Sequence, residues 1–138
     1  MKSTQRQRAP DFNLLDLDGL PVSSSIMRGK VLILDFWATW CGPCTEEMPT
    51  LEKIREEYKS RGVEVWGISA EEPSTVKVWL ARHERRLQSL MDPDGKISEQ
   101  YQVAGIPALV VIGRNGKSSV TTPGINLNNL YVTRLIWL

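Results

Sequence analysis

Two cysteines, Cys41 and Cys44, stand two residues apart in the stretch LDFWATWCGPCTEEMP, residues 34–49. The 138-residue chain has no other cysteine. A pair with this spacing can bind a metal, attach a haem, close a small disulfide loop or exchange electrons with the thiols of another protein. The residues around the pair separate these possibilities.

Three of the four uses have little support. A structural zinc site needs four ligands, usually a second cysteine pair or histidines, and the chain has a single histidine, His83. Haem attachment needs a histidine directly after the pair, where Thr45 stands. A disulfide across two residues closes almost no loop and therefore stabilises little. Redox exchange is the favoured use, and we expect no metal.

The pair lies between a predicted buried strand and a predicted helix. Residues 31–38, VLILDFWA, form a continuous apolar run, which is typical of a strand buried on both faces in an α/β sheet. Residues 44–62 follow as a helix, because apolar residues recur at three- and four-residue spacing and Gly62 ends the pattern. Pro43 suits the first turn of this helix, whereas Pro49 inside it should kink it.

This position gives the two sulfurs different roles. Unpaired N–H groups and the positive end of the helix dipole stabilise a thiolate, which lowers the thiol pKa from its usual value of about 8.5. Cys41 lies nearer the helix start, so we expect it to attack a partner disulfide. Cys44, one turn further in, then attacks the mixed disulfide and releases the partner in its reduced form.

The remaining elements predict a mixed sheet covered by helices. Asp18-Gly19 separates two short β-like runs, as in a hairpin, and Asn115-Gly116 predicts a second hairpin. Between these two hairpins we expect a strand at 63–70 and a helix at 74–87, which begins at Ser74 and turns Val78 and Leu80 or Ala81 inward. A turn at 92–96, a short helix at 97–103 and a strand at 108–113 follow. After the second hairpin we expect a last helix at 126–138. In such a sheet the functional site lies at the carboxyl end of a buried strand.

Composition indicates one ordinary globular domain. Hydrophobic residues make up 41% of the chain and charged residues 24%, with a net charge of +1. The charge balance gives no reason to expect a nucleic-acid partner. Residues 1–8 are expected to be a flexible segment, and residues 9–138 a single, monomeric domain. The N-terminus has no apolar run behind its positive charges, so we do not expect it to be a signal peptide, and we expect membrane contact only through an anchor outside the given sequence.

Several segments resemble the thioredoxin superfamily. These are DFWATWCGPC at 35–44, the proline five residues after the second cysteine, and VAGIPALVVIGRNGK at 103–117. The segments at 9–44 and 90–108 are more similar to its TlpA/ResA-like thiol–disulfide oxidoreductase branch, which is related to the AhpC/TSA group. The resemblance extends from about Ala9 to Lys117.

The resemblance implies a thioredoxin-like fold, with a central mixed sheet flanked by helices and an N-terminal β-hairpin extension. It implies a dithiol–disulfide cycle that uses no cofactor beyond the Cys41–Cys44 disulfide. It also implies a cis Ile106–Pro107 bond beside the cysteines, where the backbone pairs with the extended substrate chain. We expect the substrate-binding surface to comprise Trp40, Gly42, Pro43, Ile106 and Pro107.

Two acids are candidates for moving the proton of the resolving thiol. Asp35 lies in the predicted buried strand, where an isolated carboxylate is costly and raises its pKa. It either accepts the Cys44 proton, as the matching aspartate does in thioredoxins, or reaches water or a lysine at the sheet edge. Many TlpA/ResA-like chains instead have a glutamate just after the next strand, which is Glu71 here. Glu71 has an alternative as a solvated loop charge, so the choice of acid stays open.

The aromatic and basic residues have simpler interpretations. Trp40 should form an apolar docking surface, whereas Trp37, Trp66 and Trp79 are expected to fill the core or the sheet edge. Basic residues gather around His83, and they form either a solvated helix face or a contact for an acidic partner: Lys77, Arg82, Arg85 and Arg86.

The sequence therefore predicts a protein-disulfide reductase, with protein thiols and disulfides as substrates and an upstream electron donor. The Gly42-Pro43 pair is of the thioredoxin type and favours a reductant. Two alternatives stay open: a thiol peroxidase of the AhpC/TSA type, although residues 38–41 lack its Pro-x-x-x-Thr-x-x-Cys pattern, and a non-catalytic redox-sensing or peptide-binding module. The resemblance favours an extracytoplasmic location, with a cytoplasmic one as the alternative.

Overall fold

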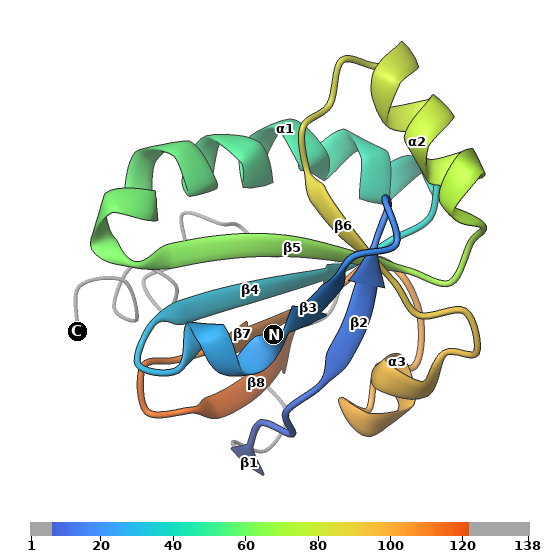
Figure 1. Cartoon of the computed structure of the whole chain (residues 1–138). Helices are drawn as coiled ribbons and strands as arrows, with labels where there is room; N and C mark the ends of the chain where they lie inside the picture. The colour runs from blue at the N-terminus through green and yellow to red at the C-terminus, as the bar shows by residue number, and fades with distance from the viewer. Residues whose placement is uncertain (1–6, 122–138) are drawn as a thin grey trace.

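A mixed sheet of eight strands forms the centre of the computed structural model, which describes residues 7–121 (Figure 1). The strand order is β1-β8-β7-β4-β5-β6-β2-β3. The strands are β1 (Gln7–Arg8), β2 (Asn13–Asp16), β3 (Pro21–Ser23), β4 (Val31–Phe36), β5 (Val63–Ser69), β6 (Gln88–Met91), β7 (Ala108–Ile112) and β8 (Lys117–Thr121). The helices are α1 (Gly42–Tyr58), α2 (Pro73–Arg82) and α3 (Lys96–Gln100), with short 3-10 turns η1 (Ser24–Met27) and η2 (Lys59–Arg61).

The strand directions agree with the predicted mixed sheet and N-terminal hairpin. β4, β5 and β6 are parallel, and they are joined through α1 and α2. β7 pairs antiparallel with β4, and β8 pairs antiparallel with β7. β2 and β3 form the predicted hairpin, with Gly19 at a φ of 79° in its turn, and β2 attaches it to β6. At the sheet centre, Asp35 of β4 lies opposite Gly67 of β5 and Leu109 of β7.

Helices cover both faces of the sheet. Figure 1 shows α1 and α2 on one side and α3 on the other. All six residues of β4 are buried, as the continuous apolar run predicts. Successive side chains of a strand point to opposite faces, so Val31 and Ile33 pack with α1, while Leu32 and Leu34 pack in the second cluster. Asp35 follows the same alternation and therefore faces α1.

Gly67 allows one large side chain to approach the sheet closely. A Cβ atom at Gly67 would lie 2.7 Å from Trp37 Nε1 and 2.7 Å from Ser89 Oγ. The glycine thus leaves space for the Trp37 indole, whose N–H donates a hydrogen bond to Ser89 Oγ at 3.2 Å. Trp37 is 2% exposed and Trp66 4% exposed, which confirms their expected places in the core.

The region between β5 and α3 differs from the sequence-based prediction. Strand β6 was not predicted, although it pairs in parallel with β5 and connects the hairpin to the sheet. Helix α2 ends at Arg82 instead of residue 87, and its N-cap is Glu72, not Ser74, because Pro73 occupies the first turn. Its buried residues are Val76 and Leu80. Of the alternatives Leu80 and Ala81, Leu80 is therefore the one that points inward, whereas Val78 is 50% exposed and its predicted inward orientation is wrong.

Predictions for the two ends of the chain have different outcomes. Gln7 and Arg8, which belong to the segment expected to be flexible, pair with Ser118 and Lys117 of β8. The helix predicted at 126–138 lies outside the described residues. Within residues 7–121, none of the helices has the length and apolar character that crossing a membrane requires.

Candidate active site

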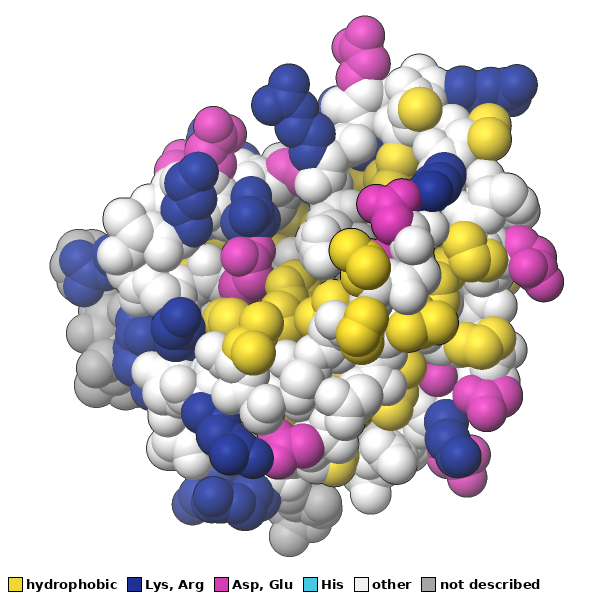
Figure 2. Space-filling model, in the orientation of Figure 1, with side chains coloured by type: hydrophobic (Ala, Val, Ile, Leu, Met, Phe, Trp, Pro, Cys, Tyr) yellow, Lys and Arg dark blue, Asp and Glu magenta, His cyan; other side chains and the backbone are white. Residues whose placement is uncertain are grey.

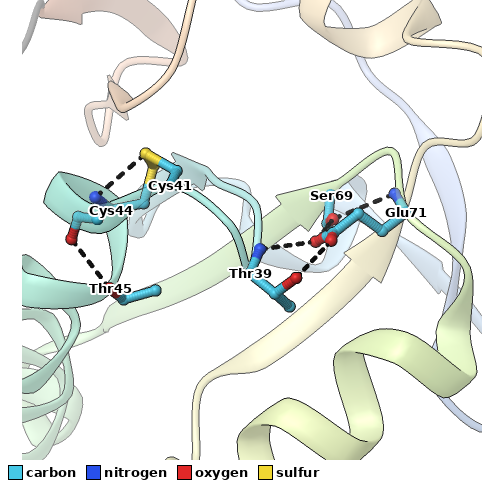
Figure 3. The surroundings of a disulfide bond; sticks show 7 residues. Thr39, Cys41, Cys44, Thr45, Ser69 and Glu71 are labelled. Carbon is cyan, nitrogen blue, oxygen red and sulfur yellow. Dashed lines mark hydrogen bonds between the residues drawn. A yellow bond between two sulfur atoms is a disulfide. The ribbon is translucent and has the colours of Figure 1, made fainter.

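The two cysteines form a disulfide at the amino end of α1 (Figure 3). Cys41 is the N-cap residue, and the Cys44 N–H donates to Cys41 Sγ at 3.3 Å. Pro43 stands in the first turn, as predicted, where its missing N–H removes no helical hydrogen bond. The Thr45 hydroxyl closes this turn by donating to the Gly42 carbonyl at 2.9 Å. Helix N–H groups therefore point at the first sulfur, where they favour negative charge.

The two cysteines differ in exposure. Cys41 is 6% exposed, whereas Cys44 is fully buried beneath it in the cluster that includes Met48 and Leu51. A partner sulfur can therefore approach only Cys41 directly. Cys44 is placed to attack Cys41 from inside the protein.

The cis Ile106–Pro107 bond, which the resemblance implied, is present. Pro107 directly precedes β7, whose first residue, Ala108, lies opposite Phe36 at the end of β4. The loop from β4 to Cys41 begins at this same end. The sheet register thus brings the proline segment and the cysteine loop to the same edge.

A hollow of about 310 Å³ lies between these two segments. Trp40 and Ile106 line it, together with Phe36, Ala38, Glu71 and Asp92. The Trp40 side chain is 75% exposed, the highest exposure among the large hydrophobic residues of the described region. An exposed indole beside a partly apolar hollow is suited to contact with another polypeptide.

Asp35 lies buried on the α1 side of the sheet. It is fully buried, and neither carboxylate oxygen has a hydrogen-bond partner among the described residues. Burial raises its pKa well above the usual value, and the nearby charge of Glu47 raises the pKa further. The interpretation of Asp35 as a carboxylate that reaches water or a lysine is therefore not supported.

Glu47 is an acid that the sequence analysis missed. It lies on α1 three residues after Cys44 and next to the buried Met48, so it shares the helix face directed at the sheet. Its Oε1 atom is buried and has no hydrogen-bond partner in the described part of the chain, and burial raises its pKa. The three-residue spacing from Cys44 was the available signal, because it places both side chains on one face.

Glu71 occupies a different position from the Asp35–Glu47 pair. Its carboxylate accepts hydrogen bonds from the Thr39 N–H at 2.9 Å, the Thr39 hydroxyl at 2.6 Å and the Ser69 hydroxyl at 3.0 Å. Figure 3 shows the side chain directed at Thr39 instead of the two sulfurs. Glu71 is therefore not a solvated loop charge; it links the cysteine loop to the end of β5.

Replacing Glu71 by alanine is expected to lower the free energy of unfolding by about 1–3 kcal/mol, because the Thr39 N–H and hydroxyl lose their acceptor. Urea denaturation of the oxidised protein measures this change. Glu72→Ala is the matched control, since Glu72 is exposed and its side chain makes no capping hydrogen bond. Equal losses in the two variants would contradict the linking role of Glu71.

The comparisons with known proteins agree with this geometry. Residues 6–119 match the model of the AhpC/TSA family. Thiol-disulfide oxidoreductase ResA of Bacillus thuringiensis subsp. konkukian is 33% identical over 112 residues, which cover 80% of this chain and 65% of that protein. ResA of Geobacillus kaustophilus is 36% identical over 110 residues, which cover 79% of this chain and 63% of that protein. The chain thus spans slightly less than two thirds of the length of these relatives.

The fold also matches a solved structure. A crystal structure of a thiol:disulfide interchange protein of the thioredoxin family from Chlorobium tepidum superposes with a TM-score of 0.83 at 26% identity, and the match covers 96% of this chain and 98% of that one. The expected thioredoxin-like fold is therefore confirmed. With its family match, its ResA homologues and its cysteine pair at the start of α1, this chain belongs to the AhpC/TSA family.

Proposed function

We propose that this protein is a thiol–disulfide oxidoreductase that reduces disulfides in other proteins. The observation that carries the proposal is the Cys41–Cys44 disulfide at the amino end of α1, with one sulfur at the surface and the other buried behind it. The names of the ResA relatives and of the Chlorobium tepidum structure support this type of chemistry.

The reduced protein starts the cycle. The Cys41 thiolate attacks one sulfur of a partner disulfide, and the second partner sulfur leaves as a thiolate. Cys44 then loses its proton and attacks Cys41 Sγ, which releases the first partner sulfur as a thiolate and forms the Cys41–Cys44 disulfide. Two electrons pass to the partner in each cycle, so an upstream dithiol must reduce the protein again.

The acid that receives the Cys44 proton is the Asp35–Glu47 pair. Asp35 lies on β4 and Glu47 on α1, which begins at the cysteines, and the Glu47 charge is near enough to raise the pKa of Asp35. Two buried carboxyl groups that lie close together retain one shared proton more readily than they both ionise. A base whose pKa is raised in this way has a pKa closer to that of a thiol and accepts its proton more readily. Glu71 acts as a positioning residue, because its carboxylate is engaged by Thr39 and Ser69.

Partner polypeptides bind across the edge that carries the disulfide. Trp40 and Ile106 border the hollow described above, and Gly42 and Pro43 are exposed beside it. The backbone before Pro107 lies at the same sheet edge as the cysteine loop, where it can pair with an extended substrate chain. This arrangement supports proteins, as opposed to small thiols, as the substrates.

The midpoint potential of the Cys41–Cys44 couple tests the direction of transfer. A reductant is expected to have a midpoint at or below about −230 mV, measured by Trp40 fluorescence in graded thiol–disulfide buffers. A midpoint above about −180 mV would identify an oxidant or isomerase instead. Absence of a reversible two-electron transition, or peroxide turnover without a partner protein, would refute the proposed function itself.

A further inference from the structure

A second hollow, of about 430 Å³, lies between the cysteine loop and α2. Thr39 forms its rim beside the loop, and α2 with the residue that follows it supplies the rest of its lining: Ser74, Thr75, Val78, Trp79, Arg82 and His83. Thr39 is held in place by Glu71 and lies two residues before Cys41. The hollow therefore borders the loop that leads to the disulfide.

The floor of this hollow contains two stacked rings, those of Trp79 and His83, and Trp37 lies edge-on against Trp79 in the core behind them. The Trp79 ring centroid is 5.4 Å from that of Trp37 in the core and 4.1 Å from that of His83 at the surface, where the two rings are almost parallel. The His83 ring is fixed in this position, because its Nδ1 atom lies 2.9 Å from the Trp79 carbonyl oxygen. Val78, at 50% exposure, adds an aliphatic side chain to this floor. Because these side chains are already held in one arrangement on an apolar surface, the protein loses little conformational entropy when a partner binds there.

The charge of the hollow is positive. Helix α2 carries two cations and no acidic residue. Lys77 is paired with Asp18 at 2.8 Å, but the Arg82 guanidinium has no ion pair or hydrogen bond among residues 7–121. Figure 2 shows hydrophobic and cationic side chains adjacent to each other over α2, at the upper right of the molecule. An aliphatic and aromatic floor with one unpaired guanidinium at its end suits an apolar side chain followed by a carboxylate.

We propose that this hollow, formed by α2 and Thr39, is a recognition subsite for acidic, apolar segments of the partner protein, near the disulfide that is reduced. The inference rests on the proposed function. In the lining of the hollow, Thr75 and His83 are eight residue steps apart, which corresponds to a rise of about 12 Å along a helix. An extended chain covers this length with about four residues. An apolar residue near the partner cysteine reaches Val78 and Trp79, and an acidic residue beyond it reaches Arg82.

Two matched peptides test the subsite. Each carries one cysteine in a mixed disulfide with glutathione, and each has a phenylalanine about four residues to either side of it. In one peptide a glutamate follows each phenylalanine, and in the other a lysine. Protein tryptophan fluorescence gives the second-order rate at which the reduced protein is oxidised. The native protein is expected to react about three- to tenfold faster with the glutamate peptide, and less so at high salt.

Arg82→Glu should reverse this preference, and Val78→Ser should slow both peptides. Arg86→Glu is the matched control: it makes the same charge change at an exposed position outside the hollow and should retain the native preference. Equal rates for the two peptides, or equal effects of the two arginine variants, would refute the subsite. Hydroxyethyl disulfide, which is small and neutral, should react equally with all variants; if neither it nor any peptide oxidised the protein, the proposed function would be the part that fails.

Discussion

Replacing Cys44 by serine is expected to trap the partner protein on Cys41 as a stable mixed disulfide. Cys41 keeps its place at the helix start, so the first attack proceeds, but no second sulfur is available to release the partner. Turnover with a protein disulfide should fall by at least about a thousandfold, as expected when a nucleophile is removed. Non-reducing electrophoresis and intact mass spectrometry would detect the covalent adduct, which a thiol reductant should release.

Cys41→Ser is the informative comparison. It should be equally inactive but should form no adduct, because Cys44 is fully buried and cannot meet a partner sulfur. If Cys41→Ser trapped partners and Cys44→Ser did not, the roles of the two cysteines would be reversed. If neither variant trapped a partner while the native protein turned over, the mixed-disulfide route would be wrong.

The cysteine site was predictable because its signals are local. The apolar run of β4, the start of α1 and the two cysteines lie within one continuous stretch, and strand–helix order together with the helix dipole determines which sulfur is reactive. The cis bond before Pro107 was different. The residues alone predicted only a turn, and the resemblance supplied the isomer.

Strand β6 was missed because its sequence signal is weak. It has four residues, of which Gln88 and Ser89 are polar, and it follows a charged loop. Its strand conformation depends on pairing with β5 on one side and with the N-terminal hairpin on the other, and these contacts come from distant parts of the chain. The start of α2 was misplaced for a different reason: the preference of proline for the first helical turn outweighed the capping preference of Ser74.

The arrangement of the acidic residues around the site could be predicted only in part from the sequence. Asp35 was identified from its place in a buried strand, but the burial of Glu47, close enough for its charge to raise the pKa of Asp35, depends on how α1 packs on the sheet. Glu71 was identified from the resemblance as a possible acid, and only the contacts with Thr39 and Ser69 reveal that its carboxylate is already engaged. Tertiary packing thus separates Asp35 and Glu47, whose buried oxygens lack hydrogen-bond partners in the described region, from Glu71, whose carboxylate is engaged.

Replacing Asp35 by asparagine is expected to have opposite effects on stability and on catalysis. The native carboxyl is fully buried without a hydrogen-bond partner, so its charged form is costly, and the nearly isosteric amide should stabilise the oxidised protein at pH 8 by about 1–3 kcal/mol. The same change removes a carboxyl that we propose as acceptor of the Cys44 proton, so the resolving step should slow by about a hundredfold, the lower end of the range for general base catalysis.

The raised pKa of Asp35 determines how the free energy of unfolding changes with pH. Burial raises the pKa of Asp35 in the folded protein above the value of about 3.9 in the unfolded chain. Between these two pKa values the folded state holds a proton that the unfolded state has lost, so the free energy of unfolding falls as the pH rises. Asp35→Asn removes this contribution, and its advantage over the native protein should therefore grow from about pH 4 upward. Urea denaturation across this range measures the difference.

Two controls separate the buried carboxyl from a general loss of negative charge. Asp94→Asn makes the same chemical change at an exposed turn and should leave the pH profile parallel to that of the native protein. Glu47→Gln should flatten the pH profile of stability in the same direction as Asp35→Asn but less, because Glu47 is only partly buried.

The double variant Asp35→Asn/Glu47→Gln should change stability by less than the sum of the two single changes, since each change removes the repulsion felt by the other carboxyl group. Additive changes would mean that the two carboxyl groups titrate independently, and Asp35 would then be the proton acceptor alone.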